Sequence, residues 1–162
     1  MFKLIFSIVL MFYTIPSYSD CDRVIIAFKG LNNSFNYDAF DRYLRHRKAC
    51  GKVFSYDQIN KAIHYVNYVN SFHKEFEFYG FSAGALSIKP VLDKSVKYPS
   101  RIITIGAYHS ADVNFDNYRV KYKNFFDLSS VGQKNKGIFL GSNHFEAEDI
   151  AVNMLIENKI KF

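Results

Sequence analysis

The chain has 162 residues, of which 49% are hydrophobic and 22% are charged. This balance supplies apolar side chains for one buried core of ordinary size, and it excludes an intrinsically disordered chain. The formal net charge of +6 comes from basic residues scattered along the sequence, most densely at Arg42, Arg45, Arg47 and Lys48. This group fits the solvated face of a helix, so no nucleic-acid partner is expected, and an attraction to anionic surfaces stays open.

The first 19 residues have the parts of a secretory signal peptide. Lys3 supplies a positive charge, and residues 4–15 are almost wholly apolar. Ser17 and Ser19 are small residues at the two positions that a signal peptidase reads, so cleavage is expected after Ser19. An uncleaved anchor is the alternative, but the apolar run is shorter than the roughly 20 residues that a bilayer span needs. We therefore expect one secreted or periplasmic domain of residues 20–162.

Export bears on the two cysteines of the chain, Cys21 and Cys50. In an oxidising compartment an even pair of cysteines indicates a disulfide. Each cysteine precedes a predicted strand, and parallel neighbouring strands would bring the two starts within bonding reach. Two free or buried thiols are the alternative.

After the leader, short apolar stretches alternate with stretches of helical periodicity. The predicted strands are residues 24–28, 52–56, 76–79, 101–105, 120–126 and 137–140. The predicted helices are residues 37–48, residues 57–72 with Asp57 as N-cap, a stretch after residue 84 that ends or kinks near Pro90, and residues 145–158. This alternation predicts an α/β fold, a three-layer sandwich whose mostly parallel six-stranded sheet has helices on both faces.

The segment G-F-S-A-G at residues 80–84 directly follows a predicted strand and opens a stretch rich in small residues. Small residues two before and two after a serine allow a tight strand-to-helix turn, which holds the serine oxygen clear of the backbone. Free N–H groups at the helix N-terminus favour negative charge, and the N–H of Ala83 would face a developing oxyanion. Ser82 is therefore the candidate nucleophile, and a glycine-rich turn with an inert serine is the alternative.

A second backbone donor and a general base are expected in two strand-end loops. Gly30 lets the chain turn sharply after the first strand, so the N–H of Leu31 can face the same oxyanion as that of Ala83. His144 follows the last predicted strand and precedes the last predicted helix, a suitable place for a base that reaches Ser82. An ordinary loop and a surface histidine are the respective alternatives.

The acid that would orient His144 is open among three aspartates. Asp127 directly follows the predicted strand 120–126, whereas Asp112 and Asp116 lie in the loop after strand 101–105. A carboxylate in contact with the imidazole would hold its tautomer and stabilise its charged form. Asp127 is preferred, and a site without an acid is also considered.

These motifs resemble those of the α/β-hydrolase superfamily. The matching parts are the nucleophile elbow at residues 80–84, the oxyanion loop at residues 29–31, and the order of nucleophile, acid and histidine along the chain. The oxyanion loop of the family usually begins with His-Gly, and Lys29 stands here in place of that histidine. The resemblance implies a minimal α/β-hydrolase fold with catalytic Ser82, Asp127 and His144, and it points to no particular substrate family.

Many members of the superfamily carry a helical cap where this chain has only residues 108–117. We therefore expect an open site without a lid, bordered by Tyr108, Phe115 and Tyr118. Such a cleft suits exposed esters, thioesters or surface lipids better than a buried metabolite.

The expected activity is hydrolysis of a small-molecule or lipid carboxylic ester, of esterase or lipase type, through an acyl-enzyme on Ser82. A monomer is expected, and contact with a membrane surface is left open. No motif for a metal site, a Walker phosphate loop or a dinucleotide occurs in the sequence, so no cofactor is expected. A non-catalytic hydrolase-like binding protein is one alternative, and an acyltransferase or thioesterase of the cell envelope is the other.

Overall fold

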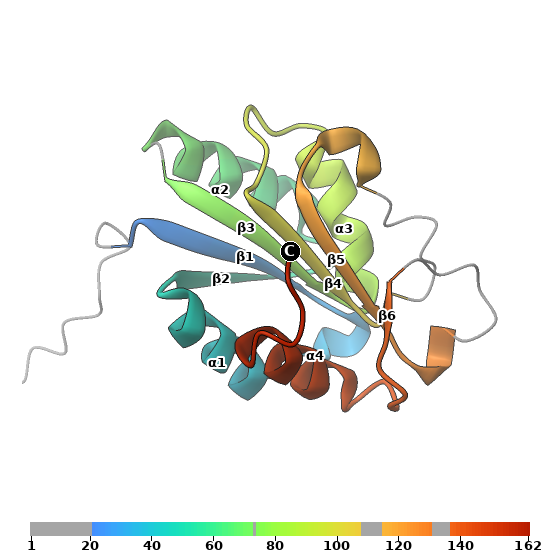
Figure 1. Ribbon diagram of the computed structural model, residues 1–162. Coiled ribbons are helices and arrows are strands. Elements are labelled where there is room, and N and C mark those ends of the chain that lie inside the picture. Colours follow the sequence, from blue (N-terminus) through green and yellow to red (C-terminus); the bar gives the residue numbers. More distant parts are fainter. Residues whose placement is uncertain (1–20, 73, 108–114, 131–136) are drawn as a thin grey trace, which may run out of the picture.

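Residues 21–72, 74–107, 115–130 and 137–162 are described by a computed structural model of the chain (Figure 1). In these residues one sheet contains β1 (Arg23–Lys29), β2 (Cys50–Ser55), β3 (Glu75–Phe81), β4 (Arg101–Ile105), β5 (Lys121–Phe126) and β6 (Ile138–Phe139). The helices are α1 (Tyr37–Arg47), α2 (Ile59–Ser71), α3 (Ala83–Leu92) and α4 (Ala147–Ile156), with short 3-10 turns η2 (Leu31–Asn33), η4 (Asp116–Tyr118) and η5 (Leu128–Ser130). The predicted leader, residues 1–19, lies outside the described ranges. Within those ranges no helix is long and apolar enough to cross a bilayer.

The sheet has the strand order β2-β1-β3-β4-β5-β6, and all neighbouring strands are parallel. Helices α1 and α4 pack on one face, and α2 and α3 pack on the other (Figure 1). Because consecutive side chains of a strand point to opposite faces, Ile25 and Ala27 enter the α1/α4 core while Ile26 and Phe28 enter the α2/α3 core. The predicted three-layer α/β sandwich is therefore confirmed, with a sheet that is parallel throughout.

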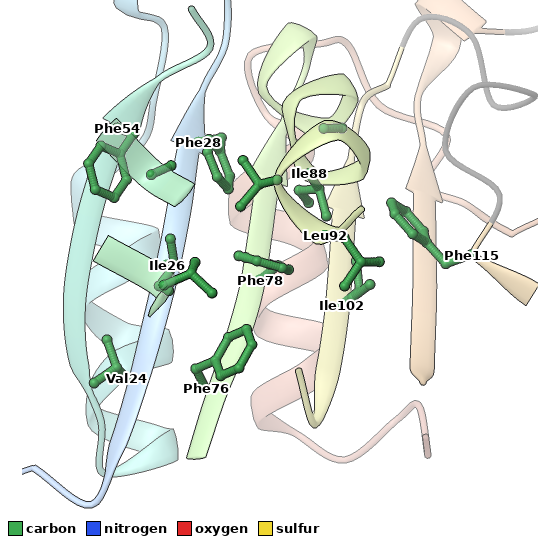
Figure 2. Packing of buried hydrophobic residues seen from close by; sticks show 14 of the residues in the cluster. Val24, Ile26, Phe28, Phe54, Phe76, Phe78, Ile88, Leu92, Ile102 and Phe115 are labelled. Atoms are coloured by element: carbon green, nitrogen blue, oxygen red, sulfur yellow. The ribbon is translucent and has the colours of Figure 1, made fainter. Parts of the chain in front are cut away.

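The core between the sheet and α2/α3 is rich in aromatic rings (Figure 2). The ring of Phe78 lies with its centroid 5.9 Å from that of Phe28 and 5.4 Å from that of Phe76. Ile88 and Leu92 of α3 pack over the same strands. This packing presses α3 onto the centre of the sheet and so positions the turn that precedes the helix.

Two residues expected to border the site lie elsewhere. Phe115 is only 1% exposed and belongs to the α2/α3 core, because its apolar ring turns inward and packs on Tyr122. The Tyr118 hydroxyl donates a hydrogen bond to Asp93, which follows the C-terminal end of α3. That end is remote from Ser82, so the expectation for both residues is wrong, and Tyr108 lies outside the described residues.

The start of α2 also differs from the prediction. Gln58, and not Asp57, is the N-cap residue of this helix. The Gln58 N–H donates to the Ser55 carbonyl at 3.0 Å, and its side-chain oxygen accepts from the Ser55 N–H at 3.2 Å. This double contact closes a turn that includes Asp57, so the helix begins one residue later than expected.

A disulfide joins Cys21 to Cys50, as the cysteine positions predict. Cys50 is the register partner of Val24 across the β1–β2 pair, and the two cysteine Cα atoms lie 5.9 Å apart. The bond therefore ties the start of β1 to the start of the edge strand β2.

Removal of this disulfide is expected to lower the free energy of unfolding by about 3 to 4 kcal/mol, because the bond closes a loop with a sequence separation of 29. The Cys21→Ser/Cys50→Ser variant and the oxidised wild type would be compared by urea unfolding. Wild-type protein kept reduced serves as the control and should match the variant. Equal stability of the variant and the oxidised protein would show that the disulfide does not stabilise the fold by restricting the unfolded chain.

Candidate active site

Ser82 occupies a sharp turn between β3 and α3. Its backbone has φ 53° and ψ −126°, a region that residues other than glycine rarely adopt. The Ser82 N–H donates to the Ile105 carbonyl at 2.9 Å, and the Ser82 carbonyl accepts from the Ala85 N–H at 3.1 Å. These two bonds hold the serine in its strained conformation at the carboxyl edge of the sheet.

The glycines on either side of Ser82 are required by close backbone contacts. A Cβ atom on Gly80 would lie 2.5 Å from the Cα of Ala85, and one on Gly84 would lie 2.2 Å from the carbonyl oxygen of Phe28. Helix α3 therefore starts directly against the ends of β3 and β1, with no room for side chains at these positions. This contact explains why the small residues stand two before and two after the serine.

Asp127 and His144 are in direct contact at the same edge. Asp127 follows β5 and is fully buried, and its Oδ2 atom lies 2.7 Å from Nδ1 of His144. Its other oxygen, Oδ1, accepts hydrogen bonds from the N–H and the hydroxyl of Ser129. With a carboxylate at Nδ1, the neutral imidazole carries its proton on Nδ1 and leaves Nε2 able to accept one.

The imidazole of His144 is packed against residues next to Ser82. The ring stacks on that of Phe81, the residue before the serine, with centroids 4.9 Å apart and planes at 25°. A Cβ atom on Gly106 would lie 2.9 Å from Cε1 of His144 and 2.8 Å from Oδ2 of Asp127. Gly106 has φ 62° and follows Ile105, the residue that binds the Ser82 N–H. Serine and histidine are thus held at one place by the ends of β3 and β4.

No hydrogen bond joins Ser82 Oγ to His144 among the described residues. Contacts between a nucleophile and its base are often long or misaligned before substrate binds, and they tighten in the complex. Both side chains lie at the carboxyl edge of the sheet, linked through Phe81 and Ile105.

The N–H groups of Leu31 and Ala83 have no acceptor among the described residues. Ala83 is the first residue of α3, where N–H groups lack intrahelical acceptors. Leu31 follows Gly30, where a Cβ atom would lie 2.8 Å from Cβ and 3.3 Å from Oγ of Ser82. The Gly30 N–H and the Ser34 carbonyl close this loop with a 2.9 Å bond. The Leu31 N–H therefore belongs to a loop that lies against Ser82, and the Ala83 N–H belongs to the residue that follows Ser82.

Other candidates for the acid receive less support. Asp112 lies outside the described residues, and Asp116 begins the 3-10 turn η4. In the described part of the chain, Asp127 is the aspartate that contacts His144. No group of three or more His, Cys, Asp or Glu side chains in the described ranges is arranged to hold a metal ion.

A pocket of about 480 Å³ lies next to residues that pack against the His144 ring, although neither Ser82 nor His144 lines it. Its lining residues are Ser34, Phe35, Asn36, Tyr37, Asp38, Phe81, Phe145 and Glu148. Phe81 stacks on His144, and Phe145, which is 83% exposed, has its ring centroid 6.3 Å from that of the imidazole. The pocket therefore combines four aromatic rings with polar side chains, and two of its aromatic residues, Phe81 and Phe145, neighbour the candidate base.

Glu148, in the wall of this pocket, is a site residue that the motifs do not indicate. It is 1% exposed, and it accepts hydrogen bonds from the Asn36 N–H at 2.6 Å and from the Tyr79 hydroxyl at 3.0 Å. Burial raises the pKa of Glu148 to about 7, although both hydrogen bonds act in the opposite direction. The carboxyl group thus links α4, β3 and the loop before α1 around the pocket.

The titration of Glu148 should make stability depend on pH. Below pH 4.5 the folded and unfolded chains both hold the proton, so the group contributes no difference. Between pH 4.5 and 7 the unfolded chain releases its proton first, and stability falls as pH rises. Above pH 7 the charged carboxylate lowers the free energy of unfolding by its full amount, which is about 3 kcal/mol for a pKa raised from 4.5 to about 7.

Replacing Glu148 by glutamine should remove this dependence, because the amide stays neutral at every pH. In urea unfolding, the free energy of unfolding of Glu148→Gln relative to that of wild type should rise by up to about 3 kcal/mol between pH 4.5 and pH 8. Glu146→Gln, at an exposed position in the same segment, controls for the loss of one charge. A difference between Glu148→Gln and wild type that is the same at both pH values would contradict a raised pKa.

Comparison with known proteins shows the fold alone. No protein-family model and no curated protein matches the sequence. A solved structure that matches is that of a protein from Pectobacterium atrosepticum described as a "putative YdeN-like hydrolase". The alignment covers 86% of this chain and 91% of that chain, with a TM-score of 0.53 and 11% sequence identity. The match shows a shared overall fold, which in this chain is an α/β architecture with an all-parallel six-stranded sheet.

Proposed function

We propose that this protein is a serine hydrolase that cleaves carboxylic esters, of esterase or lipase type, through an acyl-enzyme on Ser82. One observation carries the proposal. A strained serine turn, a histidine bonded to a buried aspartate, and two N–H groups without acceptors converge at one edge of the sheet. The description of the structural neighbour as a hydrolase agrees with this chemistry.

In the proposed reaction Ser82 Oγ attacks the carbonyl carbon while Nε2 of His144 accepts the hydroxyl proton. Asp127 holds the Nδ1 proton and stabilises the imidazolium. The N–H groups of Leu31 and Ala83 donate to the oxyanion of the tetrahedral intermediate. His144 then returns the proton to the departing alkoxide. A water molecule, deprotonated by His144, attacks the acyl-enzyme, and the acid product leaves as Ser82 regains its proton.

The aromatic pocket beside His144 is the proposed place for the apolar part of the ester. Phe35, Phe81 and Phe145 line it, and aromatic surfaces of this kind bind apolar groups by burying them from water. Its volume of about 480 Å³ suits an acyl or alcohol group of moderate size.

We also infer that the domain works outside the cytoplasm. The disulfide between Cys21 and Cys50 belongs to a class of bond that forms and persists in oxidising compartments. The leader-like residues 1–19 point the same way.

A fluorophosphonate probe tests the proposal directly. Ser82 Oγ should form a bond to phosphorus as fluoride leaves, and mass spectrometry should find the label on the peptide that contains Ser82. Heat-denatured protein is the control and should stay unlabelled, because the reaction needs an activated hydroxyl. A folded protein that stays unlabelled would contradict the proposal and would favour the alternative of a non-catalytic binding protein. Label on another serine would equally contradict the assignment.

A further inference from the structure

A second pocket, of about 250 Å³, lies at the opposite edge of the sheet from Ser82. Arg101 and Lys121, which line it, are register partners at the starts of β4 and β5. Ser82 and Asp127, in contrast, follow the carboxyl ends of β3 and β5. The two pockets are therefore separated by the length of the strands, and the second has no part in the proposed ester hydrolysis.

The walls of this pocket are strongly basic. Arg47, Arg101, Lys121 and Lys161 all line it, together with His46. Gathering like charges in one pocket costs electrostatic free energy, which a bound anion would recover.

The nearby side-chain carboxylates of Glu75 and Glu77 pair with arginines of β1 and α1. Glu77 is buried and forms ion pairs with Arg47 and Arg23, and Glu75 pairs with Arg23 at 2.6 Å. The ion pairs of the described residues include none to Arg101, Lys121 or Lys161. Three cations therefore line the pocket without a carboxylate partner in the described part of the chain.

The chain after α4 positions one of these cations. The segment returns from α4 across the sheet (Figure 1), and Ile160 and Phe162 pack against the α1/α4 core. The Arg101 guanidinium lies 4.5 Å from the centroid of the Phe162 ring, and Lys123 Nζ lies 6.0 Å from the same centroid. Stacking of this kind leaves the N–H groups in the guanidinium plane free to donate to an acceptor.

We propose that this pocket binds the phosphate group of a small phosphorylated molecule or of a lipid headgroup. A guanidinium fork matches phosphate oxygens in a bidentate geometry, and two ammonium groups add compact positive charge. The volume of about 250 Å³ suits one headgroup-sized anion. The proposal does not depend on the activity of Ser82.

Calorimetric titration with inorganic phosphate and with glycerol phosphate tests the free anion. The Lys121→Gln/Lys161→Gln variant, changed at two exposed positions, should weaken binding at least tenfold, because charge-assisted hydrogen bonds are lost. Lys61→Gln/Lys94→Gln removes the same charge at exposed positions outside the pocket and should change the affinity less than twofold. Arg101→Gln should also lose binding, with thermal unfolding to check its fold.

Sedimentation with vesicles tests the lipid source. Phosphatidylglycerol vesicles, but not phosphatidylcholine vesicles, should retain the wild type and the Lys61→Gln/Lys94→Gln control, and they should release the Lys121→Gln/Lys161→Gln variant. Loss in the pocket variant in either arm supports the site and identifies the source of the phosphate. Absence of binding in both arms, or equal loss in the control variant, would overturn the proposal.

Discussion

Replacing Ser82 by alanine should lower kcat for a simple carboxylic ester by about 10⁶-fold, because the acyl-enzyme route is lost. The free N–H groups of Leu31 and Ala83 would remain and could still polarise a bound carbonyl. A small residual rate above that of water is therefore expected. The variant should fold, because alanine meets the same backbone strain at φ 53° as serine does.

The measurement is the hydrolysis rate of a p-nitrophenyl ester by purified wild type and Ser82→Ala, with thermal unfolding of both. Ser71→Ala is the matched control, since Ser71 is an exposed serine at the end of α2, and it should keep the wild-type rate. A Ser82→Ala protein that retains more than about one hundredth of the activity would exclude Ser82 as the nucleophile.

Replacing Asp127 by asparagine should lower kcat by about 10⁴-fold through the tautomer of His144. Ser129 donates its N–H and its hydroxyl to Oδ1 of Asp127, so the asparagine carbonyl oxygen should take that position. The amide NH₂ then faces Nδ1 of His144, which must become an acceptor. Its proton moves to Nε2, the nitrogen that has to accept the proton of Ser82.

NMR of the imidazole nitrogens checks this mechanism alongside the kinetics. Wild type should show the proton on Nδ1, and Asp127→Asn should show it on Nε2. Ser129→Ala leaves one donor on Oδ1 and the carboxylate in place, so its tautomer should be that of wild type. An Asp127→Asn protein with the wild-type rate would mean that another group orients the histidine.

The turn at Ser82 was predictable because it leaves a local spacing of small residues in the sequence. Glycines at 80 and 84 are needed where α3 meets β3 and β1, and that need appears in the sequence as a spacing. The strands were predictable for a related reason. β1 is buried on both faces and reads as an unbroken apolar run at residues 24–28, and β3 reads as a short run of large apolar residues interrupted by Glu77.

Contacts between distant segments could not be predicted in this way. Phe81 on His144 and Asn36 on Glu148 join parts of the chain whose separation says nothing about their meeting. Phe115 misled the prediction because an aromatic residue in a polar loop looks like a surface residue. Its ring instead fills the core beside Tyr122.

By itself the sequence determined the alternation of strands and helices, the disulfide pair and the turn at Ser82, since each leaves a pattern within a few residues or in the cysteine count. The tertiary structure alone decided which aspartate meets His144, and it created the aromatic pocket and the basic pocket at the two edges of the sheet. The physical reason is that burial and parallel register bring strand ends together from the whole chain. Such proximity depends on packing and not on any local run of residues.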